Sequence, residues 1–282
     1  MVFQPGLLQD KRILVTGGGT GLGKSMGRRF LELGAWLTIC GRREEVLAET
    51  KAAFDAEFGD RTAIHRCDVR DPDSVEAMVA AIWADQGGLD ILVNNAAGNF
   101  VARSETLSHR AVDAVLDIVL HGTAYATLAC GKRWIASGHP GSVLSIVASY
   151  AWTGAPYVVP SAMGKAGVLA MTRALAAEWG AKGVRLNAIA PGPFPTEGAW
   201  QRLVPDEAAA DAWRARVPVG RFGEHGELAD LAAFLVSDRA GFINGEVVTI
   251  DGGEWLKGAS HFSSLDRLSE DDWAEMRGRK GG

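Results

Sequence analysis

The sequence predicts a single α/β domain built on a doubly wound, seven-stranded parallel sheet with helices on both faces. Three observations support this fold class. Short apolar runs alternate with helical patterns, a glycine cluster follows the first run, and no Gly/Ser-rich linker or internal repeat divides the chain. Nearly continuous apolar strands that alternate with helices are typical of parallel sheets covered on both faces.

The expected strands are seven short runs that are apolar and partly β-branched, a composition that favours buried strands. In chain order they are Arg12–Thr16, Trp36–Cys40, Thr62–Cys67, Leu89–Asn94, Ser142–Ala148, Val184–Ala190 and Glu246–Ile250. Apolar residues at helical spacing predict helices at Gly23–Leu33, Arg43–Phe58, Asp73–Trp83, Asp113–Ala136 and Ala162–Trp179. We expect the domain to span residues 1–257, with a substrate loop at about 191–218. For the polar tail, 258–282, partial disorder and contact with a neighbouring subunit both remain open.

Composition narrows the class of protein. The 282 residues are 47% hydrophobic and 22% charged, as in a soluble globular protein, and the net charge of −5 argues against a nucleic-acid partner. No run approaches the length of a membrane span, and the N-terminus does not resemble a signal peptide, so we expect a cytoplasmic protein. The histidines lack paired ligand spacing, which predicts no metal site. Cys40, Cys67 and Cys130 form no C-x-x-C pair and are expected to be small apolar packing groups in a reducing compartment.

The glycine cluster "TGGGTGLG" lies directly between the first expected strand and the first expected helix. Glycine permits a tight turn there and lets a pyrophosphate approach the backbone at a helix N-terminus, where amides and the helix dipole favour an anion. Glycine-rich turns also occur merely to reverse a chain, but the flanking strand and helix favour dinucleotide binding. The residues expected to contact the dinucleotide are Gly17, Gly19, Thr20, Gly21, Leu22 and Gly23.

The end of the second strand, "TICGRREE", indicates which dinucleotide binds. A carboxylate at this point would hydrogen-bond the adenosine ribose of NAD, but Gly41 occupies it. Arg42 and Arg43 follow, and a guanidinium there can bind a 2′-phosphate. The alternative is a solvated helix start, where two arginines are unusual because that end of a helix prefers acids. We therefore expect NADP(H) rather than NAD(H).

Four further strings, "CDVRD", "NNAAG", "NAIAPGPFPT" and "GEVVTIDGG", complete a pattern that resembles the short-chain dehydrogenase/reductase family, whose fold is Rossmann-type. The resemblance runs from about Leu8 to Leu256. It implies that Asp68 and Val69 contact the adenine and that Asn95, Ala96 and Ala97 lie beside the cofactor. It also implies that the loop at Pro191 and Gly192, the backbone near Phe194 and the Thr196 hydroxyl hold the nicotinamide carboxamide.

The active site of this family usually contains Tyr-x-x-x-Lys and a serine upstream, and this chain departs from both. Lys165 is present, but Ser161 stands four residues before it and Ala148 stands at the usual serine position. Tyr150 follows Ala148 by two residues, and we expect it at the end of the fifth strand, facing the ligand crevice. Tyr125 is expected in the core, and Tyr157 is an open second candidate.

This rearrangement resembles the NADPH-dependent 2,4-dienoyl-CoA reductases, through "NNAAGNF", "DIVL-x-GTA", "VVPSA-x-x-KAGV" and "PGP-x-x-T-x-GA". The resemblance implies hydride delivery from NADPH to a dienoyl thioester, with negative charge developing on the thioester oxygen. Tyr150 would donate a hydrogen bond to that oxygen, while Lys165 would hold the nicotinamide ribose and Ser161 would position the nicotinamide or Lys165. His121 stands where the subfamily has an asparagine that shares the oxygen, so it would be either a replacement donor or a helix-packing residue.

Two other readings remain open: a reductase of another carbonyl or acyl substrate, and a non-catalytic NADPH-binding protein. An acyl-CoA would also need cations for its phosphates. The basic residues expected near the substrate mouth are Arg103, Arg110, Arg202, Arg214 and Lys257. The family pairs through helices corresponding to Asp113–Ala136 and Ala162–Trp179, which implies a homodimer or homotetramer.

Overall fold

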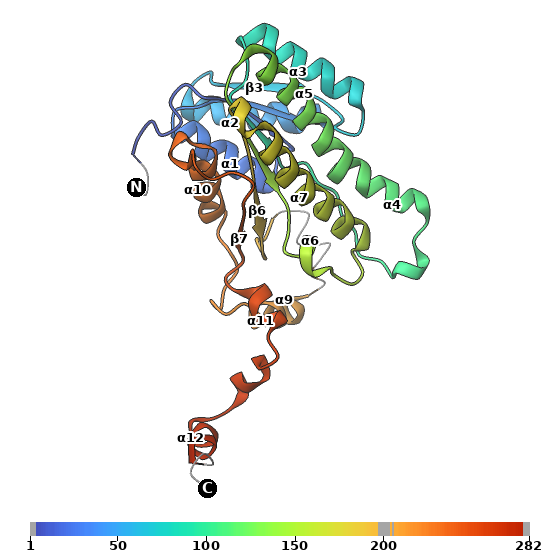
Figure 1. Ribbon diagram of the computed structural model, residues 1–282, viewed down its shortest axis with the longest axis vertical. Helices are drawn as coiled ribbons and strands as arrows, with labels where there is room; N and C mark the ends of the chain where they lie inside the picture. Colours follow the sequence, from blue (N-terminus) through green and yellow to red (C-terminus); the bar gives the residue numbers. More distant parts are fainter. Residues whose placement is uncertain (1–3, 197–203, 205, 279–282) are drawn as a thin grey trace.

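A seven-stranded parallel sheet forms the centre of the computed structural model, which describes residues 4–196, 204 and 206–278 (Figure 1). The strand order is β3-β2-β1-β4-β5-β6-β7, which confirms the predicted fold class. The strands are β1 (Arg12–Thr16), β2 (Trp36–Gly41), β3 (Thr62–Arg66), β4 (Ile91–Asn94), β5 (Gly141–Ile146), β6 (Val184–Pro191) and β7 (Val247–Ile250). Chain order reverses between β1 and β4, the point where open α/β sheets bind ligands.

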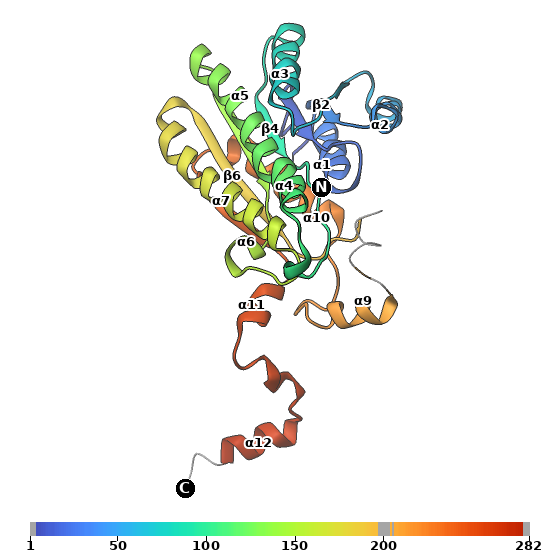
Figure 2. The ribbon, with the colours of Figure 1, turned by 90° about the vertical axis from the view of Figure 1, so that its right-hand side faces the viewer.

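Helices cover both faces of the sheet because each face carries its own apolar core. On one face pack α1 (Gly21–Glu32), α2 (Glu44–Phe58) and α10 (His225–Val236). On the other lie α3 (Pro72–Gln86), α4 (His109–Leu116), α5 (Gly122–Ser137) and α7 (Val159–Trp179), side by side in Figure 2. Trp134 of α5 is fully buried in this second core, and its Nε1 donates to the Leu89 carbonyl oxygen over 2.6 Å.

The helix predicted at Asp113–Ala136 is longer and less regular than expected. It runs from His109 to Ser137, and a π-helical turn at Asp117–His121 joins α4 to α5. Among the described residues, this helix alone is long and apolar enough to cross a membrane, but half of its most apolar window is buried inside the protein, as in a core helix. Single π turns frequently occur at functional sites.

Three short helices lie near the carboxyl ends of the strands (Figure 1): α6 (Tyr150–Thr153) after β5, α9 (Glu207–Arg214) after β6, and α11 (Glu254–Ala259) after β7. A 3₁₀ turn at Ser263–Arg267 and α12 (Glu270–Gly278) then extend beyond the body of the molecule, as Figures 1 and 2 show. The described part of the tail is therefore partly helical.

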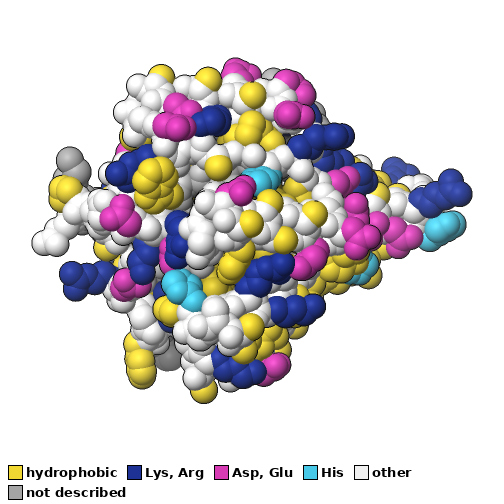
Figure 3. Space-filling view, turned by 90° about the horizontal axis from the view of Figure 1, so that it is seen from above, with side chains coloured by type: hydrophobic (Ala, Val, Ile, Leu, Met, Phe, Trp, Pro, Cys, Tyr) yellow, Lys and Arg dark blue, Asp and Glu magenta, His cyan; other side chains and the backbone are white. Residues whose placement is uncertain are grey.

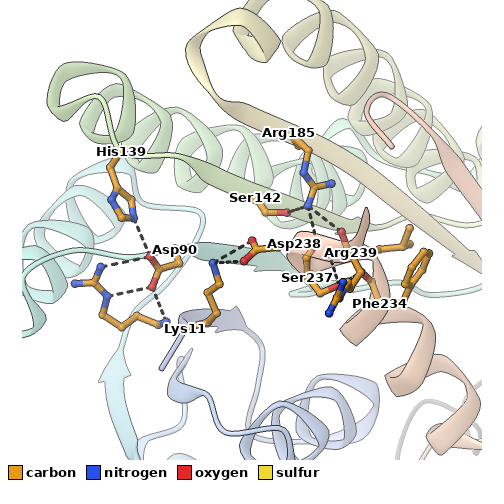
Figure 4. A network of polar contacts seen from close by, with 11 residues as sticks. Lys11, Asp90, His139, Ser142, Arg185, Phe234, Ser237, Asp238 and Arg239 are labelled. Atoms are coloured by element: carbon orange, nitrogen blue, oxygen red, sulfur yellow. Dashed lines mark hydrogen bonds and ion pairs between the residues drawn. The ribbon is translucent and has the colours of Figure 1, made fainter. Parts of the chain in front are cut away.

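Polar contacts join the strands at the opposite, amino-terminal edge of the sheet (Figure 4). Asp90, just before β4, accepts from the Arg12 backbone N over 2.7 Å and from Arg12 Nε over 3.1 Å, and its other oxygen lies 2.8 Å from His139 Nε2. Burial raises the pKa of Asp90, but these hydrogen bonds lower it more, so the net shift is downward. On the face seen in Figure 3, basic and acidic side chains are interspersed rather than gathered into a basic surface.

Candidate active site

A cavity of about 1070 Å³ opens at the carboxyl ends of the strands. Its walls come from the segments after β1, β2, β3, β4, β5 and β6, together with α9 and α11. Typical small-molecule pockets are about 300–1,000 Å³, so the cavity is large enough to hold a dinucleotide and part of a second ligand. All the site residues predicted from the sequence except Arg202, which lies outside the described residues, can be placed relative to this cavity.

Of the residues expected to contact the dinucleotide at the glycine turn, Gly17, Gly19, Thr20, Gly21 and Leu22 line the cavity. Gly17 and Gly21 adopt φ values of 66° and 53°, which other residues rarely adopt. The first turn of α1 contains no acidic residue, so nothing there opposes the attraction of an anion to the helix N-terminus.

Gly23 does not line the cavity but packs behind it. A Cβ on Gly23 would lie 2.5 Å from Asn95 Nδ2, so only glycine lets α1 approach the end of β4 this closely. The amide of Asn95 donates to the carbonyl oxygens of Thr16 and Gly17, over 3.0 and 3.2 Å. Asn95 thus fixes the glycine turn against β4, while Asn95, Ala96 and Ala97 themselves line the cavity.

Two arginines and an aspartate lie at the adenosine end expected from the sequence. Arg42 and Arg43 line the cavity, and within the described chain neither guanidinium has a hydrogen bond or an ion pair of its own. Asp68 and Val69 line the same end. The carboxylate of Asp68 is held by Arg70, with Arg70 Nη2 2.6 Å from Oδ2, and this contact lowers the pKa of Asp68. The donor set at Arg42 and Arg43 fits a phosphate better than a neutral ribose.

The loop after β6 provides the next wall. Pro191, Gly192 and Thr196 line the cavity, and the Thr196 side chain lies against Gly21, where an added Cβ would meet it at 3.4 Å. The Phe194 side chain instead turns into the core and covers Gly223. The predicted contact from the backbone near Phe194 stays a prediction.

Tyr150 reaches the cavity from a different element than expected. Strand β5 ends at Ile146, and Tyr150 begins the short helix α6 instead of ending the strand. Its hydroxyl lies 3.1 Å from the Ser161 hydroxyl, which is buried in the first turn of α7. Burial raises the pKa of Tyr150, and the hydrogen bond with Ser161 opposes this only in part. Tyr150 is therefore a neutral hydrogen-bond donor near neutral pH, beside Ala148 at the vacant serine position.

Lys165 lies one turn after Ser161 on α7 and lines the same cavity. It is only 7% exposed, and its Nζ donates to the carbonyl oxygen of Ile146 at the end of β5. Burial without a carboxylate partner lowers the pKa of Lys165 to about 8. The site thus combines one neutral hydroxyl donor with one ammonium whose charge is costly until an anion binds nearby.

The structure does not bring His121 to the cavity, which corrects the expectation that it shares the oxyanion site. Its side chain is 48% exposed, its Nδ1 lies 2.9 Å from Asp117 Oδ1 one helical turn away, and its ring stacks on Tyr125. Tyr125 packs against the core, as predicted. The residue of this π turn that does line the cavity is Ile118. The helix-packing reading of His121 fits this placement.

Tyr157 is likewise outside the site. Its side chain is 56% exposed and is not among the residues that line the cavity, although Ala155 and Pro156 are. Among the three tyrosines, only Tyr150 contributes to the cavity wall.

The sequence predicted a substrate loop at about 191–218, which includes α9, but not the residues with which α9, α11 and their flanks line the cavity. Trp213, Arg216, Glu254 and Trp255 line it, and Trp213 Nε1 donates to Glu254 Oε1 over 2.7 Å. Trp255 also meets Trp152 edge to face, with ring centroids 5.7 Å apart. The nine tryptophans of the chain were the signal that could have pointed to an apolar ligand wall.

The basic residues predicted at the substrate mouth lie elsewhere. Arg103, Arg110, Arg214 and Lys257 do not line the cavity, and Arg202 lies outside the described residues. Arg214 sits over the Phe222 ring at 5.0 Å, and Lys257 pairs with Asp266 at 2.7 Å. Arg216 is the cation at this end of the described cavity wall, 70% exposed and 3.6 Å from Glu254.

Comparisons with known proteins point to one family. Residues 17–254 match the family model described as enoyl-(acyl carrier protein) reductase. A Bacillus subtilis protein named a probable 2,4-dienoyl-CoA reductase, (2E)-enoyl-CoA-producing, is 43% identical over 88% of this chain and 98% of its own length. A Caenorhabditis elegans protein named probable 2,4-dienoyl-CoA reductase 3, (3E)-enoyl-CoA-producing, is also 43% identical, over 99% of this chain and 94% of its own.

Solved structures share the fold as well as the sequence pattern. A gluconate 5-dehydrogenase from Burkholderia cenocepacia, in complex with NADP and tartrate, superposes with a TM-score of 0.83 at 32% identity, covering 89% of this chain and 98% of that one. The glycine turn, the strand order, the lysine on α7 and these matches lead to one conclusion. The chain belongs to the short-chain dehydrogenase/reductase family, oxidoreductases that use a nicotinamide dinucleotide cofactor.

Proposed function

We propose that the protein is an NADPH-dependent 2,4-dienoyl-CoA reductase that reduces a 2,4-dienoyl thioester to an enoyl-CoA. The observation that carries the proposal is the pair formed by Tyr150 and Ser161, with hydroxyls 3.1 Å apart, at a cavity that Lys165 and Ala148 also line. Two relatives that match nearly the whole chain bear the name of this activity.

NADPH is the proposed form of the cofactor. Two arginines without an ion pair of their own in the described chain, Arg42 and Arg43, line the adenosine end where a 2′-phosphate would lie. The bound NADP of the Burkholderia structure supports the same choice. When bound, the cofactor supplies a hydride.

Tyr150 is the proposed donor to the thioester oxygen. Its raised pKa keeps the hydroxyl protonated, and Ser161 can donate to the phenol oxygen while Tyr150 donates to the substrate. Lys165 would hold the nicotinamide ribose, and its ammonium, which burial destabilises, would gain from negative charge developing on the substrate. A preorganised donor of this kind typically contributes about 3–4 kcal/mol to transition-state stabilisation.

The acyl-CoA would lie against the wall formed by Trp213 and Trp255, with Arg216 able to bind a phosphate of the CoA moiety. Trp rings provide a large apolar surface with little conformational freedom, which suits an acyl chain. Arg216 is mostly exposed, so it can move from Glu254 to an anionic ligand.

Consumption of NADPH with a medium-chain 2,4-dienoyl-CoA tests the proposal. The same protein is assayed with a saturated acyl-CoA, a 2-enoyl-CoA and a ketone, and with NADH in place of NADPH. Turnover confined to the dienoyl thioester supports the assignment, and NMR of the product places its double bond, because the two relatives' names differ on this point. Tight NADPH binding without turnover of the dienoyl thioester would reject it.

One observation favours a second candidate, an oxidoreductase of another carbonyl or acyl substrate. With His121 away from the cavity, the second donor implied by the resemblance is missing at that position. The Burkholderia relative is named for a sugar-acid substrate. Turnover of a ketone or hydroxy acid at least tenfold faster than that of any dienoyl thioester would establish this alternative.

We also propose a homo-oligomer, a dimer or a tetramer, through α5 and α7. Leu128 on α5 is 40% exposed, and Met163 on α7 is 50% exposed, so both helices present apolar side chains to solvent. Light scattering coupled to size exclusion measures the number of subunits, and a monomer at micromolar concentration would contradict this.

A further inference from the structure

Two cysteines lie together in the wall of the cavity, at its adenosine end. Cys40 is the second-last residue of β2. Cys67 directly follows β3, the neighbouring strand. Cys40 is paired in register with His65, and the backbone N of Cys67 donates to the Gly41 carbonyl oxygen over 2.9 Å. Both side chains belong to the same core, and both residues line the cavity.

Cys40 and Cys67 lie on neighbouring strands in one core, and the interaction between their side chains shifts the pKa values of both thiols. Ser74 on α3 donates a hydrogen bond to Cys67, with its hydroxyl 3.6 Å from Cys67 Sγ. Donation from Cys40 lowers the pKa of Cys67 to about 7, with Ser74 adding to the effect, while the same contact and burial raise that of Cys40. This asymmetry distinguishes a nucleophile from a resolving thiol.

Cys130 provides a contrast within the same chain. Cys130 in α5 is as buried as Cys40 and Cys67, but it does not line the cavity, and burial raises its pKa to about 12. A thiol that stays protonated is a poor nucleophile toward oxidants.

We propose that Cys40 and Cys67 are an oxidisable dithiol whose disulfide weakens NADP(H) binding. The proposal requires only that this cavity binds a nicotinamide dinucleotide, and it holds whichever substrate the enzyme reduces.

Hydrogen peroxide is the oxidant considered. The Cys67 thiolate attacks one peroxide oxygen, so an S–O bond forms, the O–O bond breaks and the departing hydroxide takes a proton to become water. The Cys40 thiol then attacks the sulfur of the sulfenic acid, the S–S bond forms, and a second water leaves with the proton from Cys40. Two thiols lose two electrons in total, and one peroxide becomes two waters.

The disulfide acts on the cofactor through the residues next to each cysteine. A sulfur–sulfur bond is about 2.05 Å long, shorter than any contact between two thiols, so its formation draws the two side chains together and shifts the residues next to them. Gly41 and Arg42 follow Cys40, and Asp68 and Val69 follow Cys67, and all four line the adenosine end. A bound dinucleotide would cover this wall, so NADPH should protect the thiols from peroxide.

Peroxide treatment of the full chain, with and without saturating NADPH, tests the proposal. The readouts are peptide mass mapping of disulfides, free-thiol counts and NADPH affinity by fluorescence titration. We expect a Cys40–Cys67 disulfide in the NADPH-free protein, at least tenfold weaker NADPH binding, recovery with dithiothreitol, and at least fivefold slower oxidation with NADPH bound.

The matched variants are Cys67→Ala, Cys40→Ala and Cys130→Ala. For Cys67→Ala and Cys40→Ala, NADPH affinity should be the same before and after peroxide treatment. For Cys130→Ala, peroxide treatment should weaken NADPH binding as much as it does for the unaltered protein. Should an alanine variant fail to fold, as judged by NADPH binding before oxidation, Cys67→Ser replaces it, and mapping of the unaltered chain still decides whether the disulfide forms. Three results would each overturn the proposal. These are modification of Cys130 at the same rate as Cys67, absence of the Cys40–Cys67 disulfide, and unchanged NADPH affinity of the oxidised protein.

Discussion

Replacement of Tyr150 by phenylalanine removes one hydroxyl and leaves the ring in place. Within the described chain the hydroxyl makes one hydrogen bond, with Ser161 over 3.1 Å. A hydrogen bond between neutral groups contributes about 0.5–1.5 kcal/mol to stability, so Tyr150→Phe should remain folded. In turnover the same hydroxyl is the proposed oxyanion donor, and loss of such a donor costs about 10²–10³-fold in kcat. We therefore expect a loss in rate far larger than any loss in stability.

Three measurements separate these effects: kcat with the dienoyl thioester, NADPH affinity, and the free energy of unfolding in urea. NADPH affinity should change less than about threefold, since a hydroxyl directed at the substrate contributes little to cofactor binding. Tyr157→Phe is the matched control, because Tyr157 is exposed and does not line the cavity. It should retain full activity. A Tyr150→Phe enzyme with kcat within threefold of the parent would refute the proposed role of Tyr150.

Three further predictions test the cofactor site and the electrostatics. Arg42→Ser combined with Arg43→Ser should raise the KM for NADPH by about 10–100-fold, since only NADPH carries the 2′-phosphate. The KM for NADH should stay nearly unchanged. An equal rise in KM for both cofactors would contradict the assignment of these arginines to the 2′-phosphate. Lys165→Met should abolish turnover yet raise the stability of the cofactor-free protein at pH 7 by about 1–3 kcal/mol, because burial lowers the pKa of Lys165 to about 8 and the charged form is disfavoured. The Lys165 ammonium loses its proton near pH 8 in the folded chain but only near its ordinary pKa of 10.5 in the unfolded chain. The stability of the parent protein should therefore rise between pH 8 and 10.5 relative to that of Lys165→Met. Urea unfolding of the parent and of Lys165→Met across this range checks the sign. Asp90→Asn should lower the free energy of unfolding by about 1–3 kcal/mol at pH 7, as measured in urea. The pKa of Asp90 is lowered in the folded state, so its carboxylate stabilises the folded protein above its ordinary pKa of 3.8. This stabilisation is lost as the pH falls through the lowered pKa. Parent and Asp90→Asn should then converge in stability. Equal slopes of stability against pH for both proteins would exclude this role of Asp90.

Local sequence patterns predicted the fold because each strand and helix is specified over a few residues. All seven strands form where apolar, β-branched runs predicted them, with ends that differ by no more than two residues. The glycine turn between β1 and α1 was equally readable, since positive φ at Gly17 and Gly21 is a local requirement. Arg42 and Arg43 were found for the same reason, because their position follows directly from the end of β2.

Side-chain direction was less predictable than position in the chain. Tyr150 was expected at the end of a strand and instead begins α6, which still brings its hydroxyl to Ser161. His121 was expected near the thioester oxygen, but the π turn directs it to Asp117 on the surface. A single inserted residue in a helix changes which side chains face inward, and no local signal in the sequence marks it.

The sequence by itself determined the α/β fold, the dinucleotide turn, the family, and a lysine that has Ser161 in place of its usual tyrosine partner. Only the tertiary structure brought together Cys40 and Cys67, which are separated along the chain by a whole helix but lie on neighbouring strands. Likewise, it alone brought Trp213 and Arg216 to the same cavity as the turn that holds Gly21. Strand and helix formation depends on short-range periodicity and backbone geometry. Contacts between distant residues depend on how those elements pack, which a pattern read along the chain does not contain.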